Sequence, residues 1–197
     1  SDVCSSDLVS GKIGEGFDLD GNRTNGFTSP TGETGIDNNF YHALGCAKSY
    51  RGPPRLSSGA ISTNDTMRNG AWTVLVVLHG AGNDPMNDDN VDVGLYMSGD
   101  KVVKDGNGGV ALDYTFRIKP DAKYEALYTA RTQNGVIAST APSDVMLRDP
   151  SYSQDLDLLR SRISLKMKPD GSLQGYVGGY RAWAPVYKGW VDARGPV

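Results

Sequence analysis

Cysteine and histidine are almost absent from this chain of 197 residues, which has two of each. Two cysteines can close at most one disulfide bond, so the chain is not a small scaffold held together by many bridges. The histidines, His42 and His79, lie far apart and in no HExxH spacing, which removes the usual sequence sign of a zinc hydrolase. The sequence also lacks a GxSxG elbow, a P-loop and a GxGxxG between a strand and a helix. We therefore name no catalytic residue.

Long hydrophobic runs and an excess of one charge are missing as well. No stretch approaches the ~20 apolar residues that span a bilayer, so no transmembrane segment is expected. A net charge of −3 and a pI near 5.3 offer no overall attraction to nucleic acid or anionic lipid, which argues against a nucleic-acid partner. What is abundant is turn chemistry, because 25 glycines and 10 prolines make up 35 of the 197 residues. That share exceeds the usual ~12% and predicts many turns and short strands.

The two ends of the chain have unusual sequences. Residues 1–8, SDVCSSDL, match the in-frame translation of a common sequencing-library adapter, so we interpret them as a scar and leave them out of fold reasoning. A genuine serine-rich start is the alternative. The chain has no initiator methionine and stops abruptly after residues 193–197, which suggests that both ends are truncations of a longer protein.

The role of Cys46 depends on that interpretation of the start. If Cys4 is genuine, one bridge could close a long N-terminal loop; if it is an artefact, no internal disulfide is possible. We favour a buried thiol, or half of a pair whose partner lies beyond the ends, over a nucleophile at Cys46.

The strand pair around which the rest is organised lies between Gly70 and Ser98. Residues 72–78, WTVLVVL, have almost no polar side chain, which predicts a strand buried on both faces at the centre of a core. After turn residues 80–90, strict alternation places the apolar residues on one face, at Val91, Val93, Leu95 and Met97. This half-buried strand is expected to pair antiparallel with the first.

Further strands follow at short intervals. Residues 110–118 alternate without a break and give the clearest single strand signal. Asn134-Gly135 and Asp170-Gly171 predict hairpin turns, the first between residues 125–131 and 136–140, the second between 163–168 and 172–179. A change of phase predicts a bulge near residues 159–161. Seven or eight such strands predict an all-β fold, an antiparallel two-layer β-sandwich of jelly-roll-like kind.

The regions that flank this sandwich differ from it in composition. Residues 9–70 form a loop-rich lead-in, with one short helix at residues 38–47 that begins near Asp37 as its cap. The core is expected over residues 71–180, and an aromatic, Gly- and Pro-containing tail over residues 181–197. Around the start of that tail four aromatic residues are candidates for stacking on sugar rings: Tyr180, Trp183, Tyr187 and Trp190. The alternative is a tail that covers one open end of the sandwich.

Oxygen-bearing side chains occupy alternate positions in the lead-in, at Asp18, Asp20, Asn22 and Thr24. Calcium takes six to eight oxygen ligands, and such a loop can wrap one ion, with help from Glu33, Asp37 or Asn38. The match to the helix-loop-helix calcium motif is incomplete, because Arg23 stands where that motif has glycine. A series of Asx turns that satisfies the local backbone is the alternative.

A second acidic cluster joins the two central strands and contains Asn83, Asp84, Asn87, Asp88, Asp89 and Asp92. Four carboxylates within nine residues repel one another unless they are solvated, protonated or shared with a cation. We include Asp84, Asp88 and Asp89 among the candidate metal ligands, with a solvated surface loop as the alternative. A pair formed by His79 and Asp84 or Asp88 could serve as a general base, although a capped strand end is the simpler interpretation.

Several segments together resemble a known family. These are FDLDGNRTNG, FTSPTGETGIDNNF, GNDPMNDDNVDVGLY and PDGSLQGYVGGYRAWAPVYKGW, and they cover most of residues 16–192. They resemble an uncharacterised family of secreted or lipoprotein-type bacterial envelope proteins. The resemblance implies an extracytoplasmic protein, secreted, periplasmic or on the cell surface, with a signal peptide or lipid anchor upstream. It assigns no catalytic role, and the chain lacks the cysteine expected just ahead of Phe27.

Three functions therefore remain open at this stage. The first is a non-enzymatic exported module that binds calcium for stability and takes a glycan or an envelope protein as its partner. The second is a carbohydrate-acting hydrolase that uses paired carboxylates from residues 84–92. The third is a purely structural domain of a larger envelope assembly.

Overall fold

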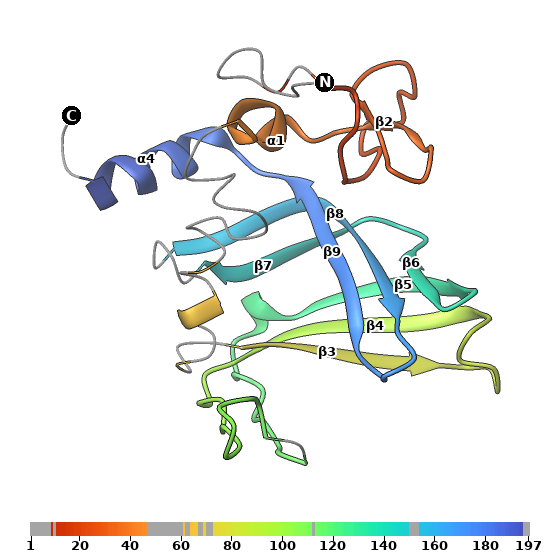
Figure 1. Cartoon of the computed structure of the whole chain (residues 1–197), viewed down its shortest axis with the longest axis vertical. Helices are drawn as coiled ribbons and strands as arrows, with labels where there is room; N and C mark the ends of the chain where they lie inside the picture. Colours follow the sequence, from red (N-terminus) through yellow and green to blue (C-terminus); the bar gives the residue numbers. More distant parts are fainter. Residues whose placement is uncertain are drawn as a thin grey trace. The chain divides into compact units, whose positions relative to one another are not determined.

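The computed structural model describes residues 9, 11–46, 61, 64–66, 69, 73–111, 113–149 and 154–194 (Figure 1). The chain divides into two compact units, residues 1–63 and residues 64–197, which we call the N-terminal and C-terminal units. Each has a hydrophobic core of its own. The proposed scar at residues 1–8, Trp72 and the end of the tail lie outside the described residues. The prediction of an all-β fold built from antiparallel sheets is confirmed.

The N-terminal unit is built mostly from loops held by a small sheet and one helix. Strands β1 (Phe27–Thr28) and β2 (Thr34–Ile36) pair antiparallel, and single bridges add Ile13 to Thr28 and Phe17 to Asp37. Buried side chains of Val9, Phe27 and Ile36 form its core, with Tyr41 and Cys46 packed against them. This core is small, so the loops around it depend on polar contacts for their shape.

Helix α1 (Asn39–Leu44) confirms the expected short helix, although its cap is one residue further along than predicted. The Asn38 side chain accepts a hydrogen bond from the backbone N–H of Tyr41, which satisfies one of the free donors at the helix start. The same amide donates to the backbone carbonyl of Glu15 at 2.7 Å. Asn38 therefore both begins the helix and ties it to the loop before β1.

The C-terminal unit holds one seven-stranded antiparallel sheet. Its strands are β3 (Thr73–Gly80), β4 (Asp88–Ser98), β5 (Ala126–Gln133), β6 (Val136–Ser139), β7 (Ser143–Asp149), β8 (Gln154–Met167) and β9 (Leu173–Tyr180). They follow the order β3-β4-β5-β6-β8-β7, and β9 pairs with β8. Most neighbours in the sheet are also neighbours in the sequence, which is a meander. A 3-10 turn, η1 (Ala122–Tyr124), precedes β5, and helix α4 (Trp183–Arg194) follows β9.

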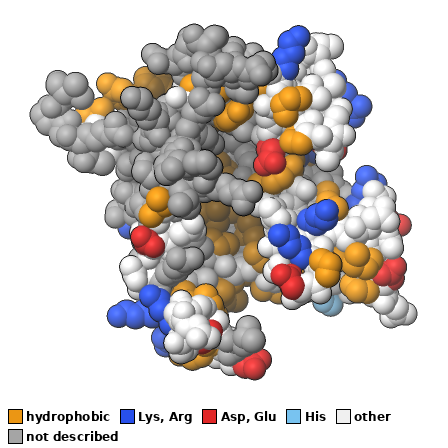
Figure 2. Space-filling model, in the orientation of Figure 1, with side chains coloured by type: hydrophobic (Ala, Val, Ile, Leu, Met, Phe, Trp, Pro, Cys, Tyr) orange, Lys and Arg blue, Asp and Glu red, His pale blue; other side chains and the backbone are white. Residues whose placement is uncertain are grey.

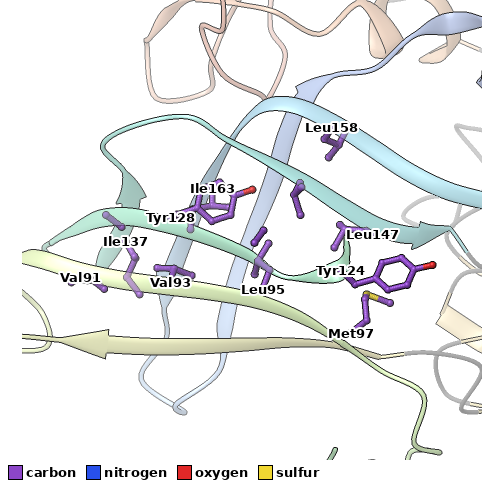
Figure 3. Packing of buried hydrophobic residues seen from close by; sticks show 13 residues of the cluster. Val91, Val93, Leu95, Met97, Tyr124, Tyr128, Ile137, Leu147, Leu158 and Ile163 are labelled. Carbon is purple, nitrogen blue, oxygen red and sulfur yellow. The ribbon is translucent and has the colours of Figure 1, made fainter. Parts of the chain in front are cut away.

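A single core fills the space between the two parts of this sheet. In Figure 1, β9 and β8 run across β3, β4 and β5, and Figure 3 shows buried side chains of β4 and β5 facing those of β7 and β8. The predicted alternation in β4 is confirmed, because Val91, Val93, Leu95 and Met97 are all buried. Tyr128, Ile137, Val145 and Ile163 complete the cluster from the other strands. The expected sandwich is therefore made by one sheet that folds over its own inner face.

Both predicted hairpins and the predicted bulge are present. Asn134 and Gly135 have φ of 48° and 76°, as a two-residue hairpin turn requires, and they join β5 to β6. Gly171 has φ of 81° in the turn from β8 to β9. The register of β8 shifts between Leu159 and Arg162, where Arg160 has φ of 49°. The shift lets the first half of β8 pair with β7 and its second half with β6.

The prediction of a central, fully buried strand at residues 72–78 is wrong. In the described residues β3 pairs with β4 alone, at the edge of the sheet, and its second half from Val76 to Gly80 is exposed. A continuous apolar run is typical of strands with two covered faces, but it does not say how many neighbours the strand has. The run instead gives the sheet an unusually hydrophobic edge.

The strand predicted at residues 110–118 does not form. Leu112 lies outside the described residues, and the rest belongs to a loop that has one isolated bridge, between Lys104 and Val110. Asp113 has φ of 59°, which interrupts an extended chain. The loop is held instead by Asp100, which accepts hydrogen bonds from the backbone and the guanidinium of Arg117, both at 2.7 Å.

Five elements of the described residues were not predicted from the sequence: β1, β2, η1, β7 and α4. β7 follows the hairpin β5-β6 after a short turn and places Val145 and Leu147 in the core. Helix α4 occupies the stretch expected to be an irregular tail, with Pro185 in its first turn, where a missing N–H costs nothing. The glycines and the proline of this stretch suggested turns, yet they are compatible with a short helix.

Candidate metal centre

Three of the predicted metal ligands converge in the N-terminal unit. Asp18, Asp20 and Asp37 each place a carboxylate oxygen within 4.8 Å of the others, and this is the one such group of acidic, histidine or cysteine side chains within the described ranges. Asp18 and Asp20 come from the loop before β1, whereas Asp37 follows β2. The bridge between Phe17 and Asp37 brings the two segments side by side. Residues nearly twenty positions apart thus form one cluster that could hold a metal ion.

The loop reaches this shape through its own polar side chains. Asp18 accepts a hydrogen bond from Gly21 N–H at 2.7 Å, and Asp20 accepts one from Asn22 N–H at 2.7 Å. Asn22 in turn accepts from both the backbone and the hydroxyl of Thr24. These are Asx turns, in which a short side chain bonds the backbone two or three residues on. The series of Asx turns, given above as the alternative to a calcium loop, is therefore present. In it Asn22 serves as a turn residue.

Asp37 locks the loop from the opposite side. Its Oδ2 accepts hydrogen bonds from the backbone N–H groups of Leu19, at 2.8 Å, and Asp20, at 3.1 Å. Among the described residues no donor reaches Asp37 Oδ1 or Asp18 Oδ2. One oxygen of each of these carboxylates therefore remains available to a ligand, in addition to the second lone pairs of the bonded oxygens.

The electrostatics of the cluster favour a cation. Hydrogen bonds from the Asn25 amide, first, and from Asn22 N–H lower the pKa of Asp20 below its usual value, so this carboxylate is charged at neutral pH. Three neighbouring carboxylates repel one another, and a bound cation relieves that repulsion. Two oxygens that bind one calcium ion at 2.3–2.6 Å can be at most about 5.2 Å apart. The spacing of 4.8 Å or less meets this limit.

The second acidic loop does not form a comparable cluster. Asp84 accepts hydrogen bonds from Met86 N–H and the Asn87 amide, and Asp88 accepts from Gly82 and Asn90 N–H. These bonds lower the pKa of both carboxyls, mainly through Asn87 for Asp84 and through Asn90 N–H for Asp88. Within the described ranges the structure does not gather Asp84, Asp88 and Asp89 into a group of three. They shape the turn between β3 and β4.

The predicted aromatic candidates cluster in part around the start of α4. The rings of Trp183 and Tyr187 lie 6.2 Å apart in an edge-to-face arrangement, and both are well exposed, at 74% and 62%. Tyr180, at the end of β9, is exposed as well. The side chain of Trp190 lies outside the described residues. The two rings are inclined by 61°, so they do not form a flat platform.

Cys46 is disulfide-bonded, so the prediction of a free buried thiol is wrong. The sequence has one other cysteine, Cys4, which lies outside the described residues. The Cys46 side chain is partly buried and packs against the cluster of Val9, Phe27 and Ile36. Within the described residues, the group that could hold a metal ion consists of Asp18, Asp20 and Asp37. It contains neither His42 nor His79.

One charged cluster had no signal in the sequence. Asp155 on β8 accepts a hydrogen bond from the buried Tyr124 hydroxyl at 2.7 Å and forms ion pairs with Lys123, at 3.2 Å, and Arg148, at 3.6 Å. Arg181 donates to the backbone carbonyl of Asp155 at 3.2 Å. The four partners come from three segments other than β8, which no spacing rule could bring together. The cluster ties η1, β7, β8 and the start of α4 to one another.

Comparisons with protein-family models, with curated proteins and with solved structures each find no match for this chain. Of the helices in the described ranges, none is both long enough and apolar enough to cross a membrane.

Proposed function

We propose that this protein is a non-enzymatic, extracytoplasmic bacterial module whose N-terminal unit is held in shape by calcium. The observation that carries the proposal is the convergence of Asp18, Asp20 and Asp37. Calcium is the ion of choice because all three ligands are hard oxygens and because calcium accepts the irregular geometry that a polar loop offers. Magnesium, in contrast, demands a nearly ideal octahedron. Backbone carbonyls of the loop and water would complete the six to eight oxygens.

The small core of the N-terminal unit explains why an ion would matter. Among the described residues of this unit, Val9, Phe27 and Ile36 form the buried hydrophobic cluster, so little apolar burial there opposes the entropy of ordering the loops. A cation that binds the folded loop alone adds stability that rises with the logarithm of its concentration over the dissociation constant. The cation would therefore stabilise the N-terminal unit, which has little hydrophobic core to hold its loops.

Two features favour a location outside the cytoplasm. Cys46 is disulfide-bonded, and disulfides persist in oxidising compartments; because Cys4 is the one other cysteine in the chain, this feature belongs to the alternative in which residues 1–8 are a genuine start. Calcium sites of extracellular modules have dissociation constants of ~10⁻⁴ to 10⁻³ M, which a loop with three carboxylates would match. The resemblance of the sequence to exported envelope proteins points the same way.

The proposed partner of the module is a glycan or another envelope component, and one observation favours a glycan. Trp183 and Tyr187 present two exposed rings within 6.2 Å of each other, and a pyranose buries its apolar face well against such rings. The inclined rings suit one sugar unit held against a ring face and a ring edge. Loss of glycan retention on Trp183→Ala, with an unchanged fold, would support this partner.

Thermal unfolding of the full chain tests the calcium proposal. Calcium at about 100 times its dissociation constant adds about 2.7 kcal/mol, enough to raise the unfolding midpoint of the N-terminal unit by several degrees. Asp18→Asn and Asp20→Asn keep the size and hydrogen-bonding oxygen of each side chain but remove its charge, so they should abolish most of this rise.

The matched control is Asp84→Asn, which changes an exposed aspartate of another Asx turn and should leave the rise intact. A midpoint that does not respond to calcium up to about 10 mM, ten times the weakest extracellular sites, would contradict the proposal. An equal loss in the Asp84 variant would show that the effect is one of general charge.

A further inference from the structure

Strand β3 leaves a hydrophobic edge open. Within the described ranges its one neighbour is β4, and its exposure changes along its length. Thr73 to Leu75 are half-buried, whereas Val76, Val77 and Leu78 are 39%, 48% and 39% exposed. In Figure 2, hydrophobic side chains come to the surface beside charged ones in the lower right of the view, over the part that holds β3 to β5.

The register of β3 shows which backbone groups point away from the sheet. Beyond the last paired residues, Ala81 N–H donates to the carbonyl of Asn90 at 3.1 Å, so Ala81 bonds toward β4. Hydrogen-bonded positions alternate along an antiparallel strand. Residues 79, 77, 75 and 73 therefore also bond toward β4, and the N–H and C=O groups of residues 74, 76, 78 and 80 face outward.

This edge lacks the devices that normally prevent pairing with another strand. Soluble proteins protect their edges with lysine, proline, inward-pointing charges or bulges, and residues 73–80 contain none of these. The other strands with one neighbour in the described ranges differ from β3. β7 carries Asp144, Arg148 and Asp149, and β9 has three glycines that weaken a strand. Residues 74–78 of β3 are instead all valine or leucine, and valine is among the residues that favour strands.

We propose that two copies of this chain pair through β3, antiparallel and about a two-fold axis at Val77, so that the sheet continues from one copy into the other. A two-fold axis perpendicular to the sheet places each side chain beside one that lies on the same face. With Val77 on the axis, Val76 meets Leu78 of the other copy and Leu75 meets His79. The outward groups of residues 76 and 78 then bond one another.

The charge pattern identifies the occupant as a second copy. A two-fold axis at Val77 sets this residue against its own counterpart and places residues 76 and 78 diagonally across from theirs, so a charge at any of these positions would lie near a like charge. Residues 73–78 carry no charge at all, although charged residues make up 22% of the chain and its net charge is −3. A strand of another protein would tolerate charges at this edge, and often uses them for selectivity.

Cross-linking through an introduced cysteine tests the register. Val77 is on the axis in a pair without hydrogen bonds, where the Cα atoms are about 4.5 Å apart, within the range of a disulfide. Val77→Cys should therefore form a covalent dimer under mild oxidation. The control is Leu127→Cys, on β5 and more exposed at 66%, which should remain a single chain. Equal cross-linking of both variants would overturn the proposal.

Sedimentation of the unaltered full chain tests the association itself. We expect a mass twice that of one chain of 21.1 kDa, and a single mass up to about 1 mM chain would overturn the proposal. Val77→Lys places two ammonium groups at the axis and should restore the single chain, with an unchanged circular dichroism spectrum. Leu127→Lys adds the same charge away from the edge and should leave the dimer intact. Loss of the dimer in both variants would show that β3 is not the interface.

Discussion

At the residue scale, Tyr128 and Ser161 form the polar contact that lies deepest in the C-terminal core. Tyr128 is 2% exposed and Ser161 is fully buried. Ser161 donates to the Ser143 carbonyl at 2.5 Å, so the Tyr128 hydroxyl, also at 2.5 Å, donates to Ser161. Burial raises the pKa of Tyr128, since an ionised phenol would be poorly solvated there. One serine oxygen therefore serves as both acceptor and donor for two strands.

The two members of this pair should not be equivalent on truncation. Tyr128→Phe leaves Ser161 with its acceptor at Ser143, so the expected loss is one hydrogen bond, about 1 kcal/mol. Ser161→Ala leaves the Tyr128 hydroxyl and the Ser143 carbonyl without a partner, and buried unpaired groups cost about 1–3 kcal/mol each. Urea unfolding of both variants measures the difference. Equal free energies of unfolding would contradict the assignment of donor and acceptor.

At the element scale, the bend in β8 sets how the two parts of the sheet face each other. Arg160 has φ of 49°, which lies in the left-handed region. Its side chain is exposed, so packing does not require an arginine at this position. Its N–H donates to Asp144 at 2.7 Å, which holds the bend against β7. The bend is therefore required by the pairing of β8 with β6, β7 and β9, and Arg160 accepts the strain.

Glycine at the bend should relieve that strain. A left-handed conformation costs an ordinary residue about 1–2 kcal/mol, and glycine loses about 0.5–1 kcal/mol of that gain to backbone entropy. Arg160→Gly should thus raise the free energy of unfolding by up to about 1 kcal/mol, or the midpoint by about 2–4 °C. Arg162→Gly, two residues on in the regular part of β8, should lower it. A destabilised Arg160→Gly variant would mean that the arginine side chain supports the bend.

Local signals predicted elements well where a turn fixed them. Asn134-Gly135 and Asp170-Gly171 adopt the conformations that their residue types favour, so both hairpins followed from the sequence. Alternation by itself was insufficient at residues 110–118, because a strand also needs a partner for its backbone groups, and Asp100 takes up the Arg117 N–H instead. The aspartates of residues 18–24 could be predicted as turn-forming residues for the same reason, because they accept hydrogen bonds from backbone groups two or three positions away.

At the scale of the whole molecule, carboxylates with lowered pKa values are spread over both units. Six aspartates have a pKa below the ordinary value of 3.8, and each is stabilised in its charged form by hydrogen bonds: Asp20, Asp84, Asp88, Asp100, Asp155 and Asp170. For Asp155 the Tyr124 hydroxyl is the first cause, followed, against the opposing effect of burial, by Lys123. Protonation of these carboxylates at low pH is therefore expected to destabilise both units.

The stability of the protein should fall as the pH drops below about 4. The folded carboxylates have the lower pKa values, so in this range the unfolded chain binds more protons and is favoured. The stabilisation is complete above the unfolded pKa and is lost as the pH falls through the folded values. Unfolding midpoints measured between pH 6 and pH 2 should show this slope, and Asp155→Asn should flatten it. A slope unchanged in that variant would remove Asp155 from the set.

The sequence by itself determined what depends on neighbouring residues. The spacing of valine and leucine in β4 fixed its buried face, Asn-Gly and Asp-Gly fixed two hairpins, and alternate aspartates fixed the loop at residues 18–24. Each of these features needs contacts within a few positions, or a face that one period defines.

Only the tertiary structure decided which segments meet. It placed β3 at an edge instead of the centre, left residues 110–118 without a partner strand, and brought Asp37 to Asp18 and Asp20. It also assembled the partners of Asp155 from three segments. Such contacts join residues far apart in the chain, and their free energy depends on burial and pairing in the whole fold, which no local pattern encodes.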